Sequence, residues 1–192
     1  MRRRTFDYLM CAAGIVVVIT LVVAGALLMW GYSFANSNVH DQLAKQEIYF
    51  PPAAAFAHAQ PGTEITPSMI PSVSQYAGQQ LLTGEQARVY ADDFIAVHLS
   101  ELPYNGVYAT LSAKARAATP GTAQAAKLTQ LEQTSFQGTT LRGLLLEAYS
   151  FSVFGNIAFW AGIAAFCLAF IMAALVGFGF WHARKTPESA EL

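Results

Sequence analysis

Charged residues are scarce in this sequence of 192 residues and are missing altogether from two long stretches. Only 12% of the residues are charged, whereas soluble domains usually carry about 25%. No charged residue occurs between Asp7 and Asp41. None occurs between Glu147 and Arg184. Two uncharged apolar blocks on either side of a mixed polar region are typical of a protein that crosses a bilayer twice.

Other shortages exclude further classes of protein. The net charge is −1, so no overall positive field favours nucleic acid as a partner. The two cysteines, Cys11 and Cys167, fall inside the apolar blocks, and the region between the blocks therefore has no disulfide framework. The sequence contains no glycine-rich phosphate loop, no Gly-x-Ser-x-Gly turn and no His-x-x-x-His or Cys-x-x-Cys pair. We therefore predict no cofactor and assign no residue as catalytic, cofactor-binding or metal-binding.

The apolar blocks predict transmembrane helices over residues 8–32 and 151–181. The part of the first block from Tyr8 to Trp30 provides roughly 34 Å of helix, against a hydrocarbon layer of about 30 Å. Its run of valine and isoleucine would favour a strand in water, but a lone strand in lipid leaves its backbone polar groups unpaired. In the second block Ala169, Ala173 and Gly177 recur every four residues. This small-residue stripe permits close approach of helices and therefore a homo-oligomer.

A cleaved signal peptide is the alternative interpretation of the first block. The arginines at positions 2–4 resemble the start of a signal, and Ser33-Phe34-Ala35 is a passable cleavage site. Signal peptides, however, have apolar cores of only about 7–15 residues. The greater length of this block favours a helix that is retained.

The charges beside the apolar blocks predict the orientation. Three arginines precede the first block at positions 2–4, and Arg184 and Lys185 directly follow the second. The region between the blocks has nine acidic and six basic residues. Because basic residues next to spans stay in the cytoplasm, we expect cytoplasmic tails at 1–7 and 182–192. The expected localisation is a cell membrane with both termini in the cytoplasm.

Helical periodicity without strand-like alternation predicts an all-α extracytoplasmic domain over residues 33–150, flanked by the two transmembrane helices. The first helix is expected to continue to Tyr49 and to stop at Pro51-Pro52, because proline lacks the N–H that a helix needs. The proline-rich chain from there to Gln80 predicts a long irregular segment.

Shorter helices are expected in the second half of this domain. The sequence from Thr83 to Gln86 has capping-box spacing and opens a helix. Pro103-Tyr104-Asn105-Gly106 predicts a turn. An alanine-rich helix then ends near Ala118, and Thr122 caps another. A last helix opens at Gly138-Thr139-Thr140 and continues into the second span, since no helix breaker separates them.

A few side chains are candidates for chemistry, and His98 is central among them. His98 and Glu101 stand three residues apart, a spacing that places both on one face of a helix. With His40, Asp41 or His58 they would form a set of two histidines and one carboxylate for a metal ion. The alternative is that His98 is an ordinary packed or capping residue.

Asp92, Asp93 and Glu101 are the candidates for acid–base chemistry by paired carboxylates. Neighbouring side chains on a helix point about 100° apart, so a solvated helix face is the alternative. Asn156 is either a functional polar residue in the membrane or a residue at the headgroups. Arg142 either keeps its head in water while its stem covers apolar surface, or it pairs with an acidic residue or a lipid phosphate.

Several stretches resemble a group of uncharacterised two-span membrane proteins of actinobacteria. These stretches are Gln75–Gln80, Gly84–Ala87, Ile95–Leu99 and Thr140–Leu146. The resemblance covers most of the middle region and the start of the second span. It implies an extracytoplasmic helical domain between two spans and carries no biochemical activity. Such proteins are sometimes labelled as ring-opening dioxygenases, for which this sequence offers too few metal ligands.

These observations predict a non-enzymatic scaffold or accessory subunit whose outer domain binds partners in the cell envelope. The expected partners are the lipid bilayer and other membrane-protein subunits. The alternative is an envelope enzyme with a metal or carboxylate site around His98, Asp92 and Glu101.

Single cysteines on either side of the second apolar block test the orientation. In a background without Cys11 and Cys167, we expect Gln124→Cys to react with a membrane-impermeant maleimide on intact cells. Ser189→Cys is expected to react only after the membrane is permeabilised, because basic tails stay in the cytoplasm. Labelling of both positions from outside would contradict the two-span topology.

Overall fold

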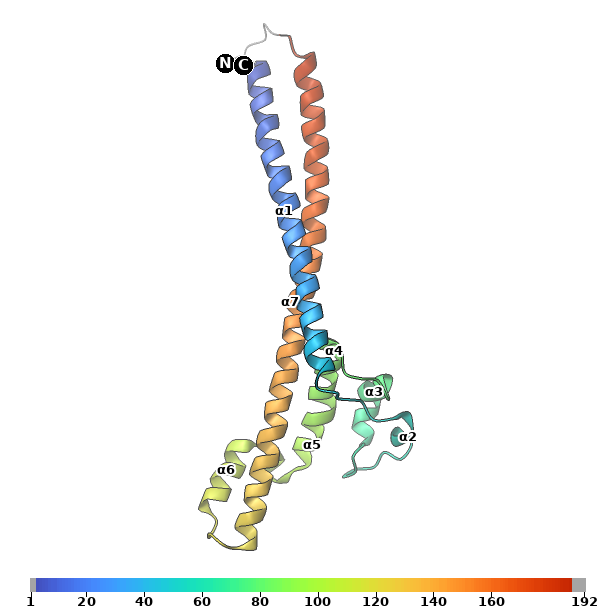
Figure 1. Ribbon diagram of the computed structural model, residues 1–192, viewed down its shortest axis with the longest axis vertical. Helices are drawn as coiled ribbons and strands as arrows, with labels where there is room; N and C mark the ends of the chain where they lie inside the picture. The colour runs from blue at the N-terminus through green and yellow to red at the C-terminus, as the bar shows by residue number, and fades with distance from the viewer. Residues whose placement is uncertain (1–2, 188–192) are drawn as a thin grey trace. The chain divides into compact units, whose positions relative to one another are not determined.

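The computed structural model describes residues 3–187 of the chain (Figure 1). Arg2 and residues 188–192, with Ser189 among them, lie outside the described residues. Over the described range the chain is helical and contains no strand. Tyr49 and Gln80 form an isolated antiparallel bridge. The predicted all-helical character is therefore confirmed.

The chain forms two compact units. The first comprises the residues up to Ala35 and those from Phe154 onward, and we call it the two-helix unit. The second comprises Asn36–Val153, and we call it the helical unit. Two long helices contribute to both units, α1 (Arg3–Ala44) and α7 (Ala123–Lys185). Each contains a stretch that is long and apolar enough to cross a membrane, as the apolar blocks predict.

In the two-helix unit, α1 and α7 lie side by side (Figure 1). Among the less exposed positions of each helix, one series recurs at alternating spacings of three and four residues. On α1 these positions are Arg4, Asp7, Cys11, Gly14, Val18, Leu21, Gly25, Leu28, Tyr32 and Ala35. On α7 they are Gly155, Ala158, Gly162, Ala165, Ala169, Met172, Val176, Gly179 and Ala183. A mean spacing of about 3.5 residues is that of a left-handed coiled coil.

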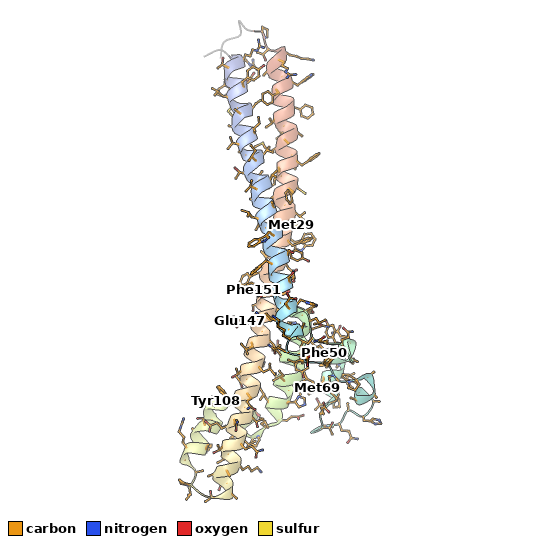
Figure 2. The ribbon with its side chains drawn as sticks, viewed as in Figure 1. Met29, Phe50, Met69, Tyr108, Glu147 and Phe151 are labelled. Carbon is orange, nitrogen blue, oxygen red and sulfur yellow. The ribbon has the colours of Figure 1, made fainter. Side chains whose placement is uncertain are left out.

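Glycines bring these two helices close together. A Cβ added at Gly14 would lie 2.5 Å from Val176 Cγ2. A Cβ at Gly162 would lie 3.2 Å from the sulfur of Met29, which Figure 2 labels. A larger side chain thus occupies the space that each glycine leaves, and this arrangement allows close packing without a hydrophobic driving force.

The small-residue stripe predicted on α7 is only partly buried. Ala169 is buried, whereas Ala173 and Gly177 are exposed. A Cβ added at Gly177 would meet nothing within 4 Å. Ala169 therefore packs within the unit, and Ala173 and Gly177 remain open to a second copy. The homo-oligomer itself stays a prediction.

A hydrophobic core holds the helical unit together, and it also orders the proline-rich segment from residue 51 to residue 80. Phe50, Met69, Leu81 and Leu145 are among its fully buried side chains. Figure 2 labels Phe50 and Met69. The segment contains only short helices, which are α2 (Ala53–Phe56), η1 (Pro67–Met69), α3 (Ile70–Val73) and η2 (Ser74–Tyr76). The predicted irregular segment is thus largely confirmed, and burial of its apolar residues offsets the entropy lost on ordering.

Helix α1 ends at Ala44, so the predicted end at Tyr49 is wrong. The chain turns at Glu47, whose φ is +51°. The Gln80 amide Nε2 donates to the Ala44 carbonyl at 3.0 Å, and a carbonyl in the last turn of a helix needs such a partner. A side chain distant in the sequence thus caps the helix before Pro51-Pro52 is reached.

The predicted capping box at Thr83 is confirmed. Gln86 N donates to Thr83 Oγ1 at 3.2 Å, and Thr83 N donates to Gln86 Oε1 at 3.0 Å. Three helical segments follow without a break: α4 (Gly84–Val89), the π-helical turn η3 (Tyr90–Ile95) and α5 (Ala96–Glu101). The π-helical turn was not part of the sequence prediction. Such turns occur inside α-helices, frequently at functional sites.

The remaining elements confirm most of the predicted turns. The turn η4 (Pro103–Gly106) and the helix α6 (Tyr108–Ala117) lie where they are predicted. Ala125 N donates to Thr122 Oγ1 at 3.1 Å, which caps the start of α7. Helix α7 then passes through Gly138 without interruption. The predicted helix start at Gly138-Thr139-Thr140 is therefore wrong, whereas the predicted continuation into the second apolar block is confirmed.

Two neighbouring leucines on α7 provide a test of this core. Leu145 is 1% exposed and Leu144 is 54% exposed. We expect Leu145→Ala to lower the free energy of unfolding by about 2–5 kcal/mol, because it removes buried methyl groups and leaves a cavity. Leu144→Ala is expected to change it by less than about 0.5 kcal/mol. Denaturant titration of the full chain in detergent measures both, and equal effects would contradict this packing.

Candidate functional site

His98 is held in one orientation by its own helix. Its Nδ1 lies 2.8 Å from the Phe94 carbonyl oxygen, and its ring meets the edge of the Phe94 ring at 4.5 Å between centroids. A carbonyl oxygen only accepts hydrogen bonds, so Nδ1 carries the proton and donates. In the neutral imidazole Nε2 is then the acceptor. His98 is thus a packed residue, which was the alternative to a metal ligand. Its Nε2 takes no part in the contact with Phe94.

Asp92, in the π-helical turn η3, binds Arg142 on α7. Arg142 Nη2 donates to Asp92 Oδ1 at 2.7 Å, and the two side chains are 39% and 35% exposed. The interpretation of Arg142 as a solvated head on an apolar stem is therefore wrong, and pairing with an acidic residue is confirmed. This contact joins two elements that are fifty positions apart in the chain. It also occupies the carboxylate that the enzyme alternative would need.

The other predicted ligands do not gather around His98. Within residues 3–187, no group of three or more histidine, cysteine, aspartate and glutamate side chains is placed to hold a metal ion. His40 instead contacts the neighbouring Asp41, at 3.3 Å between Nδ1 and Oδ1. Glu101 is exposed, and so is Asn156 on α7.

A pocket of about 460 Å³ lies beside His98. Its floor is apolar and its rim is polar; the lining residues are Glu64, Phe94, Ile95, His98, Leu99, Thr134, Gln137, Gly138 and Leu141. Gly138 allows Leu99 to approach α7, because a Cβ there would lie 2.8 Å from Leu99 Cδ2. The sequence identified His98 but missed Glu64 and Gln137, since no local pattern links residues this far apart in the chain.

Aromatic rings form a row from the core to this pocket. The ring centroids of Phe50 and Tyr90 lie 5.3 Å apart, and those of Tyr90 and Phe94 lie 4.8 Å apart. The His98 ring packs against Phe94 and ends the row. Burial raises the pKa of the Tyr90 hydroxyl, and the negative charge of Glu64 raises it further. The Glu64 carboxylate therefore acts electrostatically on this row.

A second feature of the helical unit is a group of exposed apolar side chains at η4, α6 and α7. We call it the aromatic patch, and it consists of Tyr104, Val107, Tyr108 and Phe136. The Tyr108 and Phe136 rings lie 5.6 Å apart (Figure 2 labels Tyr108). Lys114 Nζ lies 5.8 Å from the centre of the Tyr104 ring. Aromatic side chains of this kind are enriched where proteins meet.

The backbone beneath the aromatic patch is strained and firmly held. Tyr104 and Asn105 have φ values of +59° and +54°, and a left-handed conformation is unfavourable for a tyrosine. Gly106 follows at φ +62°, and a Cβ there would collide with the Leu99 carbonyl oxygen. The buried Ser135 hydroxyl donates to the Gly106 carbonyl at 2.6 Å. Strain that is held in place by its surroundings in this way is characteristic of functional sites.

No family model matches this chain, and neither a curated protein nor a solved structure is significantly similar to it. The resemblance to actinobacterial two-span membrane proteins therefore remains a prediction.

The pair of Arg142 and Asp92 can be measured by a double-mutant cycle. We expect Arg142→Lys to destabilise the chain by about 0.5–1 kcal/mol, because the ammonium lacks the geometry of the guanidinium and both partners are partly exposed. In an Asp92→Asn background the same change is expected to cost little. The exposed pair of Arg88 and Glu85, at 2.7 Å, is the matched control, with a smaller coupling expected. A coupling of zero between Arg142 and Asp92 in chemical denaturation would contradict the pairing.

Proposed function

We propose that the chain is a two-span membrane protein whose helical unit serves as a docking domain in the cell envelope. The membrane assignment rests on the apolar stretches of α1 and α7. Only 17% and 11% of these stretches are buried inside the protein. A core helix of a soluble protein buries most of its apolar residues, and exposed apolar surface of this extent requires another covering. A lipid bilayer provides it.

Interfacial side chains at the ends of the two-helix unit support the same assignment. The Lys185 ammonium lies 4.0 Å from the centre of the Trp181 ring. The Arg4 guanidinium lies 5.9 Å from that of Tyr8. Aromatic and basic residues of this kind sit at the boundary between headgroups and hydrocarbon. With the basic excess near these ends, they favour cytoplasmic termini and an extracytoplasmic helical unit.

The aromatic patch is the observation that carries the docking role. Tyr104 and Tyr108 combine a large apolar surface with a hydroxyl, and such residues dominate the binding energy of protein interfaces. A strained backbone holds Tyr104 at the surface, where its side chain is 49% exposed. We therefore infer a scaffold or accessory subunit that binds another membrane or envelope protein through this patch.

Removal of the patch is expected to release the partner while the fold is kept. We expect the combination of Tyr108→Ala and Phe136→Ala to reduce the amount of co-purifying membrane protein by about tenfold or more, as loss of interface anchors does. Tyr49 is 57% exposed, lies outside the patch, and provides the matched control as Tyr49→Ala. The measurement is quantitative mass spectrometry after purification from native membranes in mild detergent.

A photo-crosslinking amino acid at position 108 gives an independent readout of the same contact. A defined crosslinked species is expected there and not at position 49. A chain that purifies alone and forms no crosslink at position 108 would contradict the docking role, and stoichiometric metal in that sample would favour the enzyme alternative.

A further inference from the structure

The pocket beside His98 combines an apolar floor with hydrogen-bond acceptors at its rim. Ile95, Leu99 and Leu141 supply apolar surface. Its volume of about 460 Å³ falls within the range of about 300–1,000 Å³ that is usual for small-molecule sites. A pocket with this division of surfaces fits a ligand that has one polar end and an apolar body.

The acceptors at the rim define the polar end of that ligand. Because His98 Nδ1 donates to the Phe94 carbonyl at 2.8 Å, its Nε2 offers a lone pair when the ring is neutral. The Glu64 carboxylate only accepts hydrogen bonds. Both residues line the pocket, and Gln137 adds an amide group, which accepts as well as donates. A group with several N–H donors suits a pocket that offers these acceptors.

The charge of the pocket decides between a neutral donor and a cation. Among the described residues that line the pocket, Glu64 is the one aspartate, glutamate, lysine or arginine. The pocket is therefore negative and disfavours a carboxylate or phosphate. The increase in the pKa of Tyr90, to which Glu64 contributes, agrees with a negative potential over the adjoining aromatic row.

We propose that this pocket binds an organic ammonium ion with an apolar body. The ammonium group donates to the Glu64 carboxylate and to His98 Nε2, and the apolar body packs against Leu99 and Leu141. The π-helical turn η3 positions the site, because it sets the placement of Phe94 relative to His98. This site is separate from the aromatic patch, and its occupancy does not depend on a protein partner.

Three probes with a phenylalkyl body and a positive, a negative or an uncharged polar end test the proposal. They are 4-phenylbutylammonium, 4-phenylbutanoate and 4-phenylbutanol. The full chain, labelled with ¹⁵N-histidine in neutral detergent, contains four histidines, and His98→Gln identifies the signal of His98. We expect a saturable shift of that signal with the ammonium. The anion and the alcohol are expected to bind at least about fivefold more weakly, since neither provides a positive charge for Glu64.

Variants on the exposed rim separate loss of the site from loss of the fold. Glu64→Gln is expected to weaken binding of the ammonium about fivefold, because a charge-assisted hydrogen bond is lost. Glu101 is exposed and does not line the pocket, so Glu101→Gln is the matched control and is expected to leave binding unchanged. Gln137→Trp fills the entrance from an exposed position and is expected to abolish the shift.

Two outcomes would overturn the proposal. The first is equal binding of 4-phenylbutanol and 4-phenylbutylammonium, which would reduce the site to an apolar pocket. The second is an affinity for the ammonium that Glu64→Gln leaves unchanged. The histidine spectrum of each variant without ligand reports its fold directly, so an unfolded variant is recognised and does not count as a loss of binding.

Discussion

The unbroken helix α7, which is 63 residues long, is the element on which both units depend. In the two-helix unit it presents glycine and alanine toward α1, and this permits close contact where the exposed faces are apolar. In the helical unit its Leu145 fills the core and its Arg142 binds Asp92. One helix therefore carries two kinds of packing. In the two-helix unit, whose outer faces are apolar, close packing of small residues stabilises the contact between α1 and α7. In the helical unit, burial of large side chains and one ion pair stabilise the packing of α7.

The candidate sites lie where the backbone departs from regular geometry. The π-helical turn η3 (Tyr90–Ile95) holds Asp92, which binds Arg142, and Phe94, which orients His98. The left-handed residues of η4 hold Tyr104 in the aromatic patch. Contacts with α7 hold both segments, through Arg142 for η3 and Ser135 for η4. In η4 they maintain the strained backbone of Tyr104 and Asn105.

His98 illustrates how far sequence reasoning reached toward the site. The sequence singled out this residue in two ways, as part of a metal or carboxylate site with Asp92 and Glu101 or as an ordinary packed residue. The structure ties Asp92 to Arg142 and leaves Glu101 exposed. The residues that share the pocket with His98 are Glu64 and Gln137. Each lies more than thirty positions from His98, and only the folded chain brings them to one place.

The sequence by itself determined the two apolar helices, the all-helical character, the capping box at Thr83 and the turn at Pro103-Tyr104-Asn105-Gly106. The capping box and the turn depend on residues within about four positions of one another. The apolar helices depend on a long stretch without charge. Each of these features is visible as a local pattern in the sequence. Only the tertiary structure decided the end of α1, the π-helical turn, the partner of Arg142 and the passage of α7 through Gly138. The Gln80 side chain that caps Ala44 and the Leu99 side chain that packs on Gly138 come from distant parts of the chain. Contacts of that kind follow from the packing of the whole unit, and no local periodicity encodes them.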